Sequence, residues 1–313
     1  MFVYALVCFA LSDECLNYNQ IVGRSYEQSN FNVSNCFFQR FGQYSGSGGV
    51  CYISTQSASY SMFISFSTFI DCKVSSYGGA IYFYSETTGF SILKSVCGYN
   101  CSSNYGHFAF LRTSSSMKNE IDMVSSSMCY GSRYTIRFLF GQQRTSNLNL
   151  TLNSAGLTSS IQFYGPHSID SSFSTIVRNN ATTSMCIEST GTSGLLTYMN
   201  IIKNISPSLG IVTVSSGRYN YSSCVISDNQ GILLHCESSL LMVLNSYIDH
   251  SGTSVYGTVN TLNGNSFVKA GTHCISHYST QYCIANVIDP IIVTIRTKKT
   301  LFCSFFLSNI LLL

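Results

Sequence analysis

The chain is built from short segments in which apolar and polar residues alternate, separated by clusters of Ser, Asn and Gly. Leu148, Leu150 and Leu152, for example, alternate with Asn and Thr. A period of two is typical of β-strands, whereas an amphipathic helix places its apolar residues three and four positions apart. Long runs of Ala, Glu, Lys and Leu at helical spacing are absent. The pattern therefore predicts an all-β chain of many short strands.

One short pattern, an apolar residue followed three positions later by Asn, recurs at a fixed spacing. It ends at Asn179, Asn204 and Asn229, which are 25 residues apart twice running. Beyond each Asn, a small residue opens a short apolar strand, at residues 184–187, 210–214 and 231–234. Self-similarity at a period of about 20 to 50 residues is the mark of a solenoid. We therefore interpret each unit as one coil of a repeat.

Copies in the first half of the chain vary this pattern. Phe69-x-x-Cys72 precedes Gly78-Gly79-Ala80-Ile81, and Cys97-x-x-Asn100 precedes Gly106. A similar Gly-Gly pair stands at residues 48 and 49. About nine coils of roughly 22 to 30 residues fit between residues 29 and 268.

This repeat predicts a right-handed parallel β-helix over residues 31–270. An antiparallel β-sandwich would also give many short strands, but it does not explain three asparagines at equal spacing. In a β-helix these asparagines would lie one above the next, and each amide would find its partners in the adjacent coils.

Both ends of the chain differ from the repeat. Residues 1–12 are apolar and are followed by acidic Asp13, which predicts a signal peptide, with a buried first strand as the alternative. Residues 13–30 are predicted to form an N-terminal cap, and residues 271–290 a C-terminal cap. The apolar tail, 291–313, is either a cap strand or a truncated anchor that could associate with a membrane, because its apolar run is shorter than the ~20 residues of a spanning helix.

Composition narrows the choice of partners and cofactors. Charged residues make up 9% of the chain, the net charge is +3, and no basic stripe is present, so we do not expect nucleic-acid binding. The 14 cysteines do not cluster like zinc ligands, and they predict a mixture of buried thiols and inter-coil disulfides. In the C-terminal cap, Cys274 and Cys283 could form a disulfide, or could join His273 and His277 in a zinc site, a less favoured alternative. We expect no cofactor or metal.

Six Asn-x-Ser/Thr triplets are candidate glycosylation sites and fit a secreted glycoprotein. They begin at Asn32, Asn100, Asn149, Asn180, Asn204 and Asn220.

The acidic residues are few and scattered, which argues against an enzyme. Glycoside hydrolysis needs two carboxylates at one site, and the best local pair is Glu120 with Asp122 on one strand face. Gly106-His107 partly matches a Gly-His-Gly element of pectin-cleaving hydrolases, but Phe108 replaces the second Gly. No catalytic residues are therefore predicted, and a polysaccharide lyase or glycoside hydrolase is kept as the alternative.

The motif at residues 69–81 resembles a known repeat. Phe69-Ile-Asp-Cys72 followed by Gly78-Gly79-Ala80-Ile81 is similar to the polymorphic outer-membrane protein repeat. The Phe-x-x-Cys variant and the Tyr and Ser richness look more like the right-handed β-helix surface proteins of trichomonad protozoa. This resemblance implies an exported, secreted or cell-surface protein with a part in host-cell adhesion. It would bind a host or matrix protein or a glycan along its flat faces, with Tyr82, Tyr84 and Phe110 as contacts if they face outward.

Overall fold

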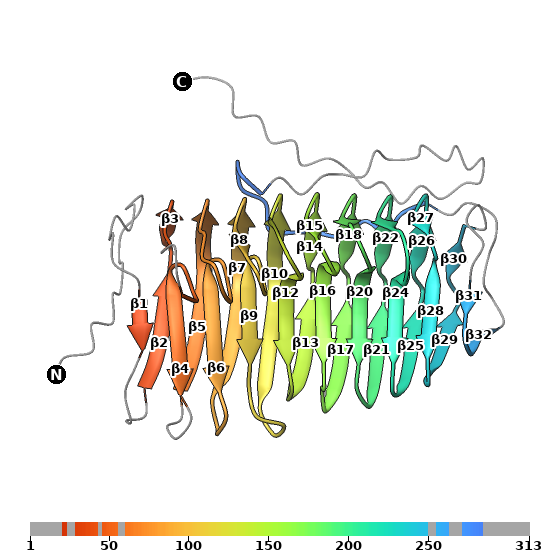
Figure 1. Ribbon diagram of the computed structural model, residues 1–313, viewed down its shortest axis with the longest axis horizontal. Helices are drawn as coiled ribbons and strands as arrows, with labels where there is room; N and C mark the ends of the chain where they lie inside the picture. Colours follow the sequence, from red (N-terminus) through yellow and green to blue (C-terminus); the bar gives the residue numbers. More distant parts are fainter. Residues whose placement is uncertain are drawn as a thin grey trace, which may run out of the picture.

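The computed structural model describes residues 21–23, 29–42, 46–55, 60–249, 255–262 and 271–283, and within these ranges all regular structure is β-strand. Every strand pair is parallel, and each strand is hydrogen-bonded to strands one coil earlier and later (Figure 1). The fold is therefore a parallel β-helix, as the repeat predicts. Its ten-stranded sheet, with about one strand per coil, agrees roughly with the expected nine coils.

The ten-stranded sheet forms one side of the β-helix. Its strands, in spatial order, are β1 (Ile21–Gly23), β4 (Cys51–Thr55), β6 (Ile81–Ser85), β9 (Ala109–Arg112), β12 (Tyr134–Leu139), β16 (Thr158–Tyr164), β20 (Met185–Thr190), β24 (Gly210–Ser215), β28 (Leu234–Glu237) and β31 (Val255–Tyr256).

The sixteen-stranded sheet bends and supplies two further sides. Long strands cross the bend in the early coils: β5 (Tyr60–Ile70), β7 (Phe90–Tyr99) and β10 (Lys118–Ser127). Pairs of shorter strands replace them elsewhere. Before the bend lie β2 (Ser29–Ser34), β13 (Gln142–Ser146), β17 (Ser168–Ser172), β21 (Ser193–Thr197), β25 (Arg218–Ser222), β29 (Leu240–Leu244) and β32 (Val259–Leu262). After it lie β3 (Phe37–Gln39), β14 (Asn149–Thr151), β18 (Thr175–Val177), β22 (Asn200–Ile202), β26 (Val225–Ser227) and β30 (Tyr247–Ile248).

Two-residue strands form the six-stranded sheet, which leads each coil back to the ten-stranded sheet. They are β8 (Ser102–Ser103), β11 (Tyr130–Gly131), β15 (Ser154–Ala155), β19 (Asn180–Ala181), β23 (Ile205–Ser206) and β27 (Gln230–Gly231).

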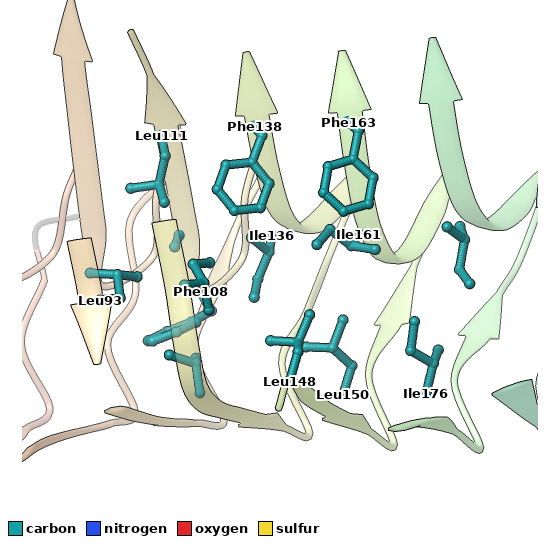
Figure 2. Packing of buried hydrophobic residues seen from close by; sticks show 14 of the residues in the cluster. Leu93, Phe108, Leu111, Ile136, Phe138, Leu148, Leu150, Ile161, Phe163 and Ile176 are labelled. Carbon is teal, nitrogen blue, oxygen red and sulfur yellow. The ribbon is translucent and has the colours of Figure 1, made fainter. Parts of the chain in front are cut away.

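Stacks of apolar side chains fill the interior because alternate strand residues point inward. Strand β6 shows this alternation, with Ile81 and Phe83 fully buried and Tyr82 and Tyr84 only partly buried. The parallel register places like residues above one another, so the rings of Phe138 and Phe163 stack with centroids 5.6 Å apart (Figure 2). Full burial of such a side chain is worth about 1.5–3 kcal/mol.

Two corners of the coil repeat a left-handed backbone conformation at non-glycine residues. One column lies at the bend of the sixteen-stranded sheet. It includes Asn147, Phe173 and Tyr198, with φ of 51°, 50° and 53°. The other precedes the six-stranded sheet and includes Asp71 and Asn100, with φ of 53° and 52°. Such residues are unfavourable one at a time, so stacked coils must hold them in place. Corner side chains consequently project outward at regular intervals.

Asparagine side chains form a ladder at the second corner. The Oδ1 atom of Asn204 accepts from the backbone N–H of Asn179 at 2.9 Å, and Asn229 does the same for Asn204 at 2.9 Å. The Nδ2 atom of Asn204 also donates to the Ile176 carbonyl at 2.9 Å. The stack predicted from the 25-residue spacing is therefore present, and Asn153 adds a further member through its N–H bond to Asn179.

Cysteines continue the same ladder toward the N-terminus. The backbone N–H of Cys129 donates to Asn153, and that of Cys101 donates to the sulfur of Cys129 at 3.4 Å. The residue equivalent to Asn179 in this coil is thus Cys101, and the expected frame Cys97-x-x-Asn100 is wrong by one position. Asn100 occupies the preceding left-handed corner instead, because the ladder accepts a thiol as well as an amide.

The glycine pairs also stack. Gly48, Gly78 and Gly106 all adopt φ between 61° and 67°. A Cβ atom added to Gly79 would lie 2.0 Å from the His107 carbonyl, which leaves no room for a side chain. The Gly-Gly-Ala-Ile motif is therefore a turn that needs both positive φ and close approach of adjacent coils.

Residues 271–283, here called the strap, lie lengthwise along the outer side of β7, β10, β14, β18 and β22 (drawn in blue in Figure 1). His273 exchanges two 2.9 Å hydrogen bonds with Asn200, and His277 bonds Thr175 at 2.8 Å. Cys283 forms a disulfide with Cys97. The expected Cys274–Cys283 bond is therefore wrong. Cys274 forms a disulfide with a cysteine other than Cys283.

Several terminal predictions lie outside the described residues. These are the signal peptide at 1–12, the apolar tail at 291–313, most of the N-terminal cap, and residues 284–290 of the C-terminal cap. Within the N-terminal cap interval, β1 pairs with β4 and so extends the ten-stranded sheet. In the part of the chain that the structure describes, no helix has the length and apolar character needed to cross a bilayer.

Candidate functional site

The outer face of the ten-stranded sheet carries a continuous column of large side chains, one from each coil. The strand register places Tyr52 beside Tyr82 and Tyr82 beside Phe110. Their rings stack with centroids 5.1 Å and 5.2 Å apart. Tyr52 and Tyr82 are half-buried, whereas Phe110 is 5% exposed and lies between its neighbours. Of the three aromatic residues named as contacts if they face outward, Tyr82 and Tyr84 are partly exposed on this face, whereas Phe110 points outward but is buried.

The column becomes polar in the next three coils. Arg137 follows Phe110, and its Nε donates to Oε1 of Gln162 at 2.6 Å. Gln162 in turn donates from Nε2 to Oε2 of Glu188 at 2.7 Å. Thr158 donates to the same carboxylate oxygen at 3.0 Å. These bonds fix three polar side chains along the direction of the helix axis.

The later coils continue the column with smaller polar groups. Thr213 lies beside Glu188 in the register, and His235 lies beside Thr213. His235 contacts the Leu209 carbonyl through Nδ1 at 2.6 Å and the Tyr256 ring at 4.8 Å. The Thr213 hydroxyl is buried and has no hydrogen-bond partner among the described residues. This part of the face therefore keeps an unused polar group.

A second outward column lies two residues further along each strand. In it, Arg112 stands 4.4 Å from the centroid of Tyr84 and pairs with Glu86 at 3.1 Å. The Tyr84 hydroxyl also donates to Glu86. A guanidinium group thus lies close to an aromatic ring of the preceding coil in both columns, Arg112 at Tyr84 and Arg137 at Phe110.

Burial changes the protonation equilibria of this face. It raises the pKa of Tyr82 above its ordinary value, with smaller contributions from neighbouring tyrosines. It also raises the pKa of the Glu188 carboxyl, although hydrogen bonds from Thr158 and Gln162 oppose the shift. Burial lowers the pKa of Arg137, yet a guanidinium stays charged at neutral pH.

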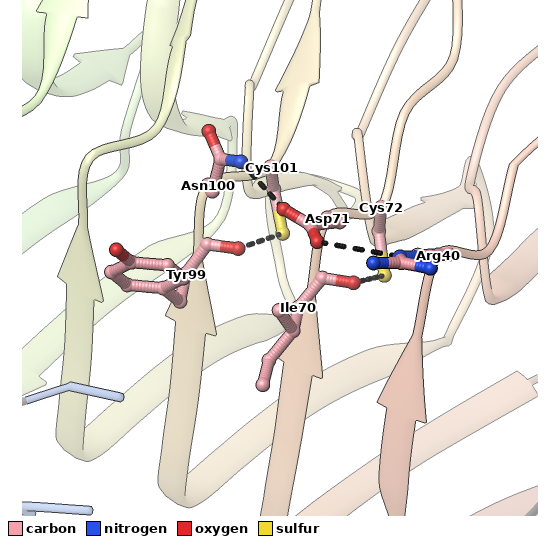
Figure 3. Close-up of polar contacts among 7 residues, drawn as sticks. All are labelled: Arg40, Ile70, Asp71, Cys72, Tyr99, Asn100 and Cys101. Carbon is pink, nitrogen blue, oxygen red and sulfur yellow. Dashed lines mark hydrogen bonds and ion pairs between the residues drawn. The ribbon is translucent and has the colours of Figure 1, made fainter. Parts of the chain in front are cut away.

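A shallow depression of about 770 Å³ lies at the corner before the six-stranded sheet. Arg40, Asp71 and Asn100 follow one another there on successive coils, with Arg40 4.0 Å from Asp71 and Asn100 donating to Asp71 (Figure 3). Arg40 is 80% exposed. Arg40 and Asn100 together satisfy the charge and the hydrogen-bonding capacity of Asp71, so we assign the corner a structural role.

The six candidate glycosylation asparagines fall into distinct environments. Asn32 and Asn180 are exposed, and Asn100 and Asn220 are partly buried. Asn149 is 1% exposed, and Asn204 is fully buried in the ladder. A glycan on Asn204 would require the ladder to break, so the exposed pair are the sites that the folded chain presents.

The acidic pair and the histidine singled out in the sequence have structural partners or positions. Glu120 pairs with Lys118 at 3.0 Å, and Asp122 accepts from Ser146 at 2.6 Å. His107 is fully buried, and its ring nitrogens have no partner among the described residues. Burial lowers the pKa of His107 to about 3. None of the three side chains faces a shared site.

The four residues of the alternative zinc site are engaged elsewhere. Cys274 and Cys283 are each held in a disulfide, and His273 and His277 bond to the sixteen-stranded sheet. Among the described residues, no three His, Cys, Asp or Glu side chains come together as metal ligands would.

Comparison with known proteins found no matching family model, curated protein or solved structure.

The polar half of the outer column was missed by the sequence interpretation. Arg137, Gln162 and Glu188 stand 25 and 26 residues apart, a signal as regular as that of the asparagines. No sequence motif marks this spacing, because the three residue types differ. Only the strand register shows that the three residues share a face.

Proposed function

We propose that this chain is a non-enzymatic cell-surface or secreted β-helix protein that binds a glycan along the outer face of its ten-stranded sheet, in an adhesive role. The observation that carries the proposal is the stacked row of Tyr52, Tyr82 and Phe110 followed by the hydrogen-bonded row of Arg137, Gln162 and Glu188.

The geometry of the face suits an extended saccharide. Coils rise by roughly 4.8 Å, close to the length of one sugar residue in an extended chain, so a glycan lying along the axis would meet one side chain per coil. Aromatic rings bind the C–H faces of sugars, and carboxylate and guanidinium groups bind hydroxyls, whereas the buried Gln162 holds Arg137 and Glu188 in place. An extended glycan needs no deep cleft, which fits a flat lateral face.

The similarity to trichomonad surface proteins and to polymorphic outer-membrane repeats supports the same proposal. It rests on Phe69-x-x-Cys72 and on the Gly-Gly-Ala-Ile turn at residues 78–81. Both motifs take part in coil stacking, Cys72 as a buried residue and Gly78 at φ 61°. The resemblance favours export to the surface, which surface labelling of tagged full-length protein on intact cells would test.

A glycan array followed by equilibrium titration tests the binding face. Loss of one stacked ring costs about 0.5–1.5 kcal/mol, so Tyr82→Ala is expected to weaken binding roughly three- to tenfold. Tyr198→Ala is the matched control, because Tyr198 is 43% exposed on a different side of the coil. Equal effects of the two substitutions, or binding only to host or matrix proteins, would contradict the proposal.

The environment of Glu188 favours the alternative function, a carbohydrate-active enzyme. Its carboxyl is largely buried on the proposed face and its pKa is raised, as a general acid requires. A reducing-sugar assay on polysaccharides tests this alternative. Release of sugar ends that Glu188→Gln abolishes would favour the enzyme over the adhesin.

A further inference from the structure

Arg137, on the outer face of β12, and Arg133, just before that strand, share one aromatic ring. The Cζ atom of Arg133 lies 4.7 Å from the centroid of Tyr105, and that of Arg137 lies 5.8 Å from it. Arg133 is exposed, whereas Arg137 is partly buried. Their charges are close enough for each to oppose the other.

Neither guanidinium has a carboxylate partner in the described part of the chain. The ion pairs found there join Arg40 to Asp71, Arg112 to Glu86, Lys118 to Glu120 and Arg144 to Asp170. Glu188 acts on Arg137 only from a distance, through the intervening Gln162. Glu188 offsets the repulsion at Arg137 from two coils away but forms no ion pair with either arginine, so an anion bound between the two guanidinium groups would supply a direct counter-charge.

The position of Arg137 is already fixed for recognition. Its guanidinium lies 4.7 Å from the centroid of Tyr134 and within 6 Å of the rings of Phe110 and Tyr164. Its Nε is used by Gln162, and no hydrogen bond to its terminal Nη atoms is found among the described residues. A guanidinium held by rings and by one hydrogen bond loses little freedom when it binds a planar anion.

We propose that Arg133 and Arg137 bind the acidic group of an acidic saccharide, a sugar carboxylate or sulfate, at the junction of the aromatic and polar rows. This inference rests on the proposed function, because the neighbouring ring of Tyr82 places the sugar. It adds that the glycan is anionic and that the anion lies over Tyr105. Guanidinium groups bind carboxylate and sulfate through paired N–H donors, so both sources share one chemistry.

Titration of the full chain with three hexasaccharides tests the inference. Oligogalacturonate carries carboxylates, a heparin-derived oligosaccharide carries sulfates, and maltohexaose is neutral. We expect an acidic probe to bind at least tenfold more tightly than maltohexaose, with affinity falling as salt rises. Which acidic probe binds more tightly identifies the carboxylate or the sulfate as the source.

Variants separate the arginine pair from general surface charge. Arg133→Gln is expected to lose at least tenfold in affinity for the acidic probe while leaving maltohexaose unaffected. Arg137 also belongs to the glycan-binding row, so Arg137→Gln is expected to weaken the acidic probe at least tenfold and maltohexaose to a smaller extent. Arg144→Gln is the control, since Arg144 is paired with Asp170 on another sheet. Arg133 is exposed, so its substitution reports on binding even if the Arg137 variant folds poorly.

The outcomes distinguish this inference from the proposed function. Equal affinity for acidic and neutral probes, both lowered by Tyr82→Ala, would overturn the inference and leave the glycan-binding face standing. Acidic binding that Arg144→Gln weakens as much as Arg133→Gln would also overturn the inference. Failure of every saccharide to bind would overturn both.

Discussion

The backbone N–H of Cys129 donates a 2.9 Å hydrogen bond to Oδ1 of Asn153, and at this point the cysteine ladder passes into the asparagine ladder. The thiols use the same partners as the amides. The Cys129 sulfur donates to the Gly98 carbonyl at 3.7 Å, just as Nδ2 of Asn179 donates to the equivalent Leu150 carbonyl at 2.9 Å. Cysteine and asparagine at this corner are therefore two versions of one structural device.

Replacement of Cys101 tests this equivalence. Burial raises the pKa of the Cys101 thiol well above its ordinary value, so it stays protonated and can donate to the Phe69 carbonyl. Cys101→Asn should be tolerated, whereas Cys101→Ala should lower the free energy of unfolding by about 1–3 kcal/mol through unpaired buried groups. Urea titration measures both, and equal losses would contradict the equivalence.

Removal of one amide from the ladder should be costly. Asn204→Ala leaves the Asn179 N–H and the Ile176 carbonyl without their partners, and we expect a loss of about 2–5 kcal/mol in unfolding free energy. Asn180→Ala is the control because Asn180 is exposed. A change below about 0.5 kcal/mol in both variants would show that the ladder does not stabilise the coils.

The buried His107 should make the fold sensitive to acid. Its pKa is lowered to about 3 in the folded chain, against roughly 6.5 when unfolded. Between these values the unfolded chain binds more protons, so stability falls by up to about 1.4 kcal/mol per pH unit as pH drops below 6.5.

The comparison with His107→Leu isolates this contribution from that of the carboxylates. We expect the unfolding free energy of the variant to fall less steeply between pH 6.5 and pH 4. Identical slopes for the two proteins would mean that His107 does not carry the effect.

A non-reducing peptide map tests the strap. We expect a peptide that joins Cys97 to Cys283. Cys283→Ser should lower the unfolding free energy by about 2–5 kcal/mol, because the bond closes a long loop in the unfolded chain. A peptide that joins Cys274 to Cys283 would contradict the arrangement.

Exposure predicts how the candidate glycosylation sites would be used. When the chain is expressed through a glycosylating secretory pathway, Asn32 and Asn180 should carry glycans, while the buried Asn149 and Asn204 should not. Enzymatic deglycosylation in heavy-oxygen water, followed by mass spectrometry, marks each used site. A glycan on Asn204 of the folded, secreted protein would contradict the ladder.

The sequence contains enough regularity to predict the coil but too little to predict what lies along its sides. The spacing of Asn179, Asn204 and Asn229 gives the period directly, because one residue type is repeated where the corner needs it. The sequence predicts the wrong residue of this coil, Asn100, for the ladder. Cys101 occupies that position, and its thiol makes the hydrogen bonds that an asparagine amide makes in later coils.

Long-range contacts follow no local pattern and could not be predicted. Cys97 and Cys283 are 186 residues apart, and the sequence around either residue does not indicate that the two pair. The outward direction of Tyr82 follows from strand alternation, but its alignment with Arg137 depends on the register across two coil boundaries. Candidate binding residues on such a face are therefore visible only after the coils are stacked.

A crystal structure of the chain with bound hexagalacturonate tests the account most directly. We predict a sugar chain along the helix axis, with a ring over Tyr82 and a carboxylate within hydrogen-bond distance of Arg133 or Arg137. An oligosaccharide ordered on the sixteen-stranded or six-stranded sheet instead would contradict it.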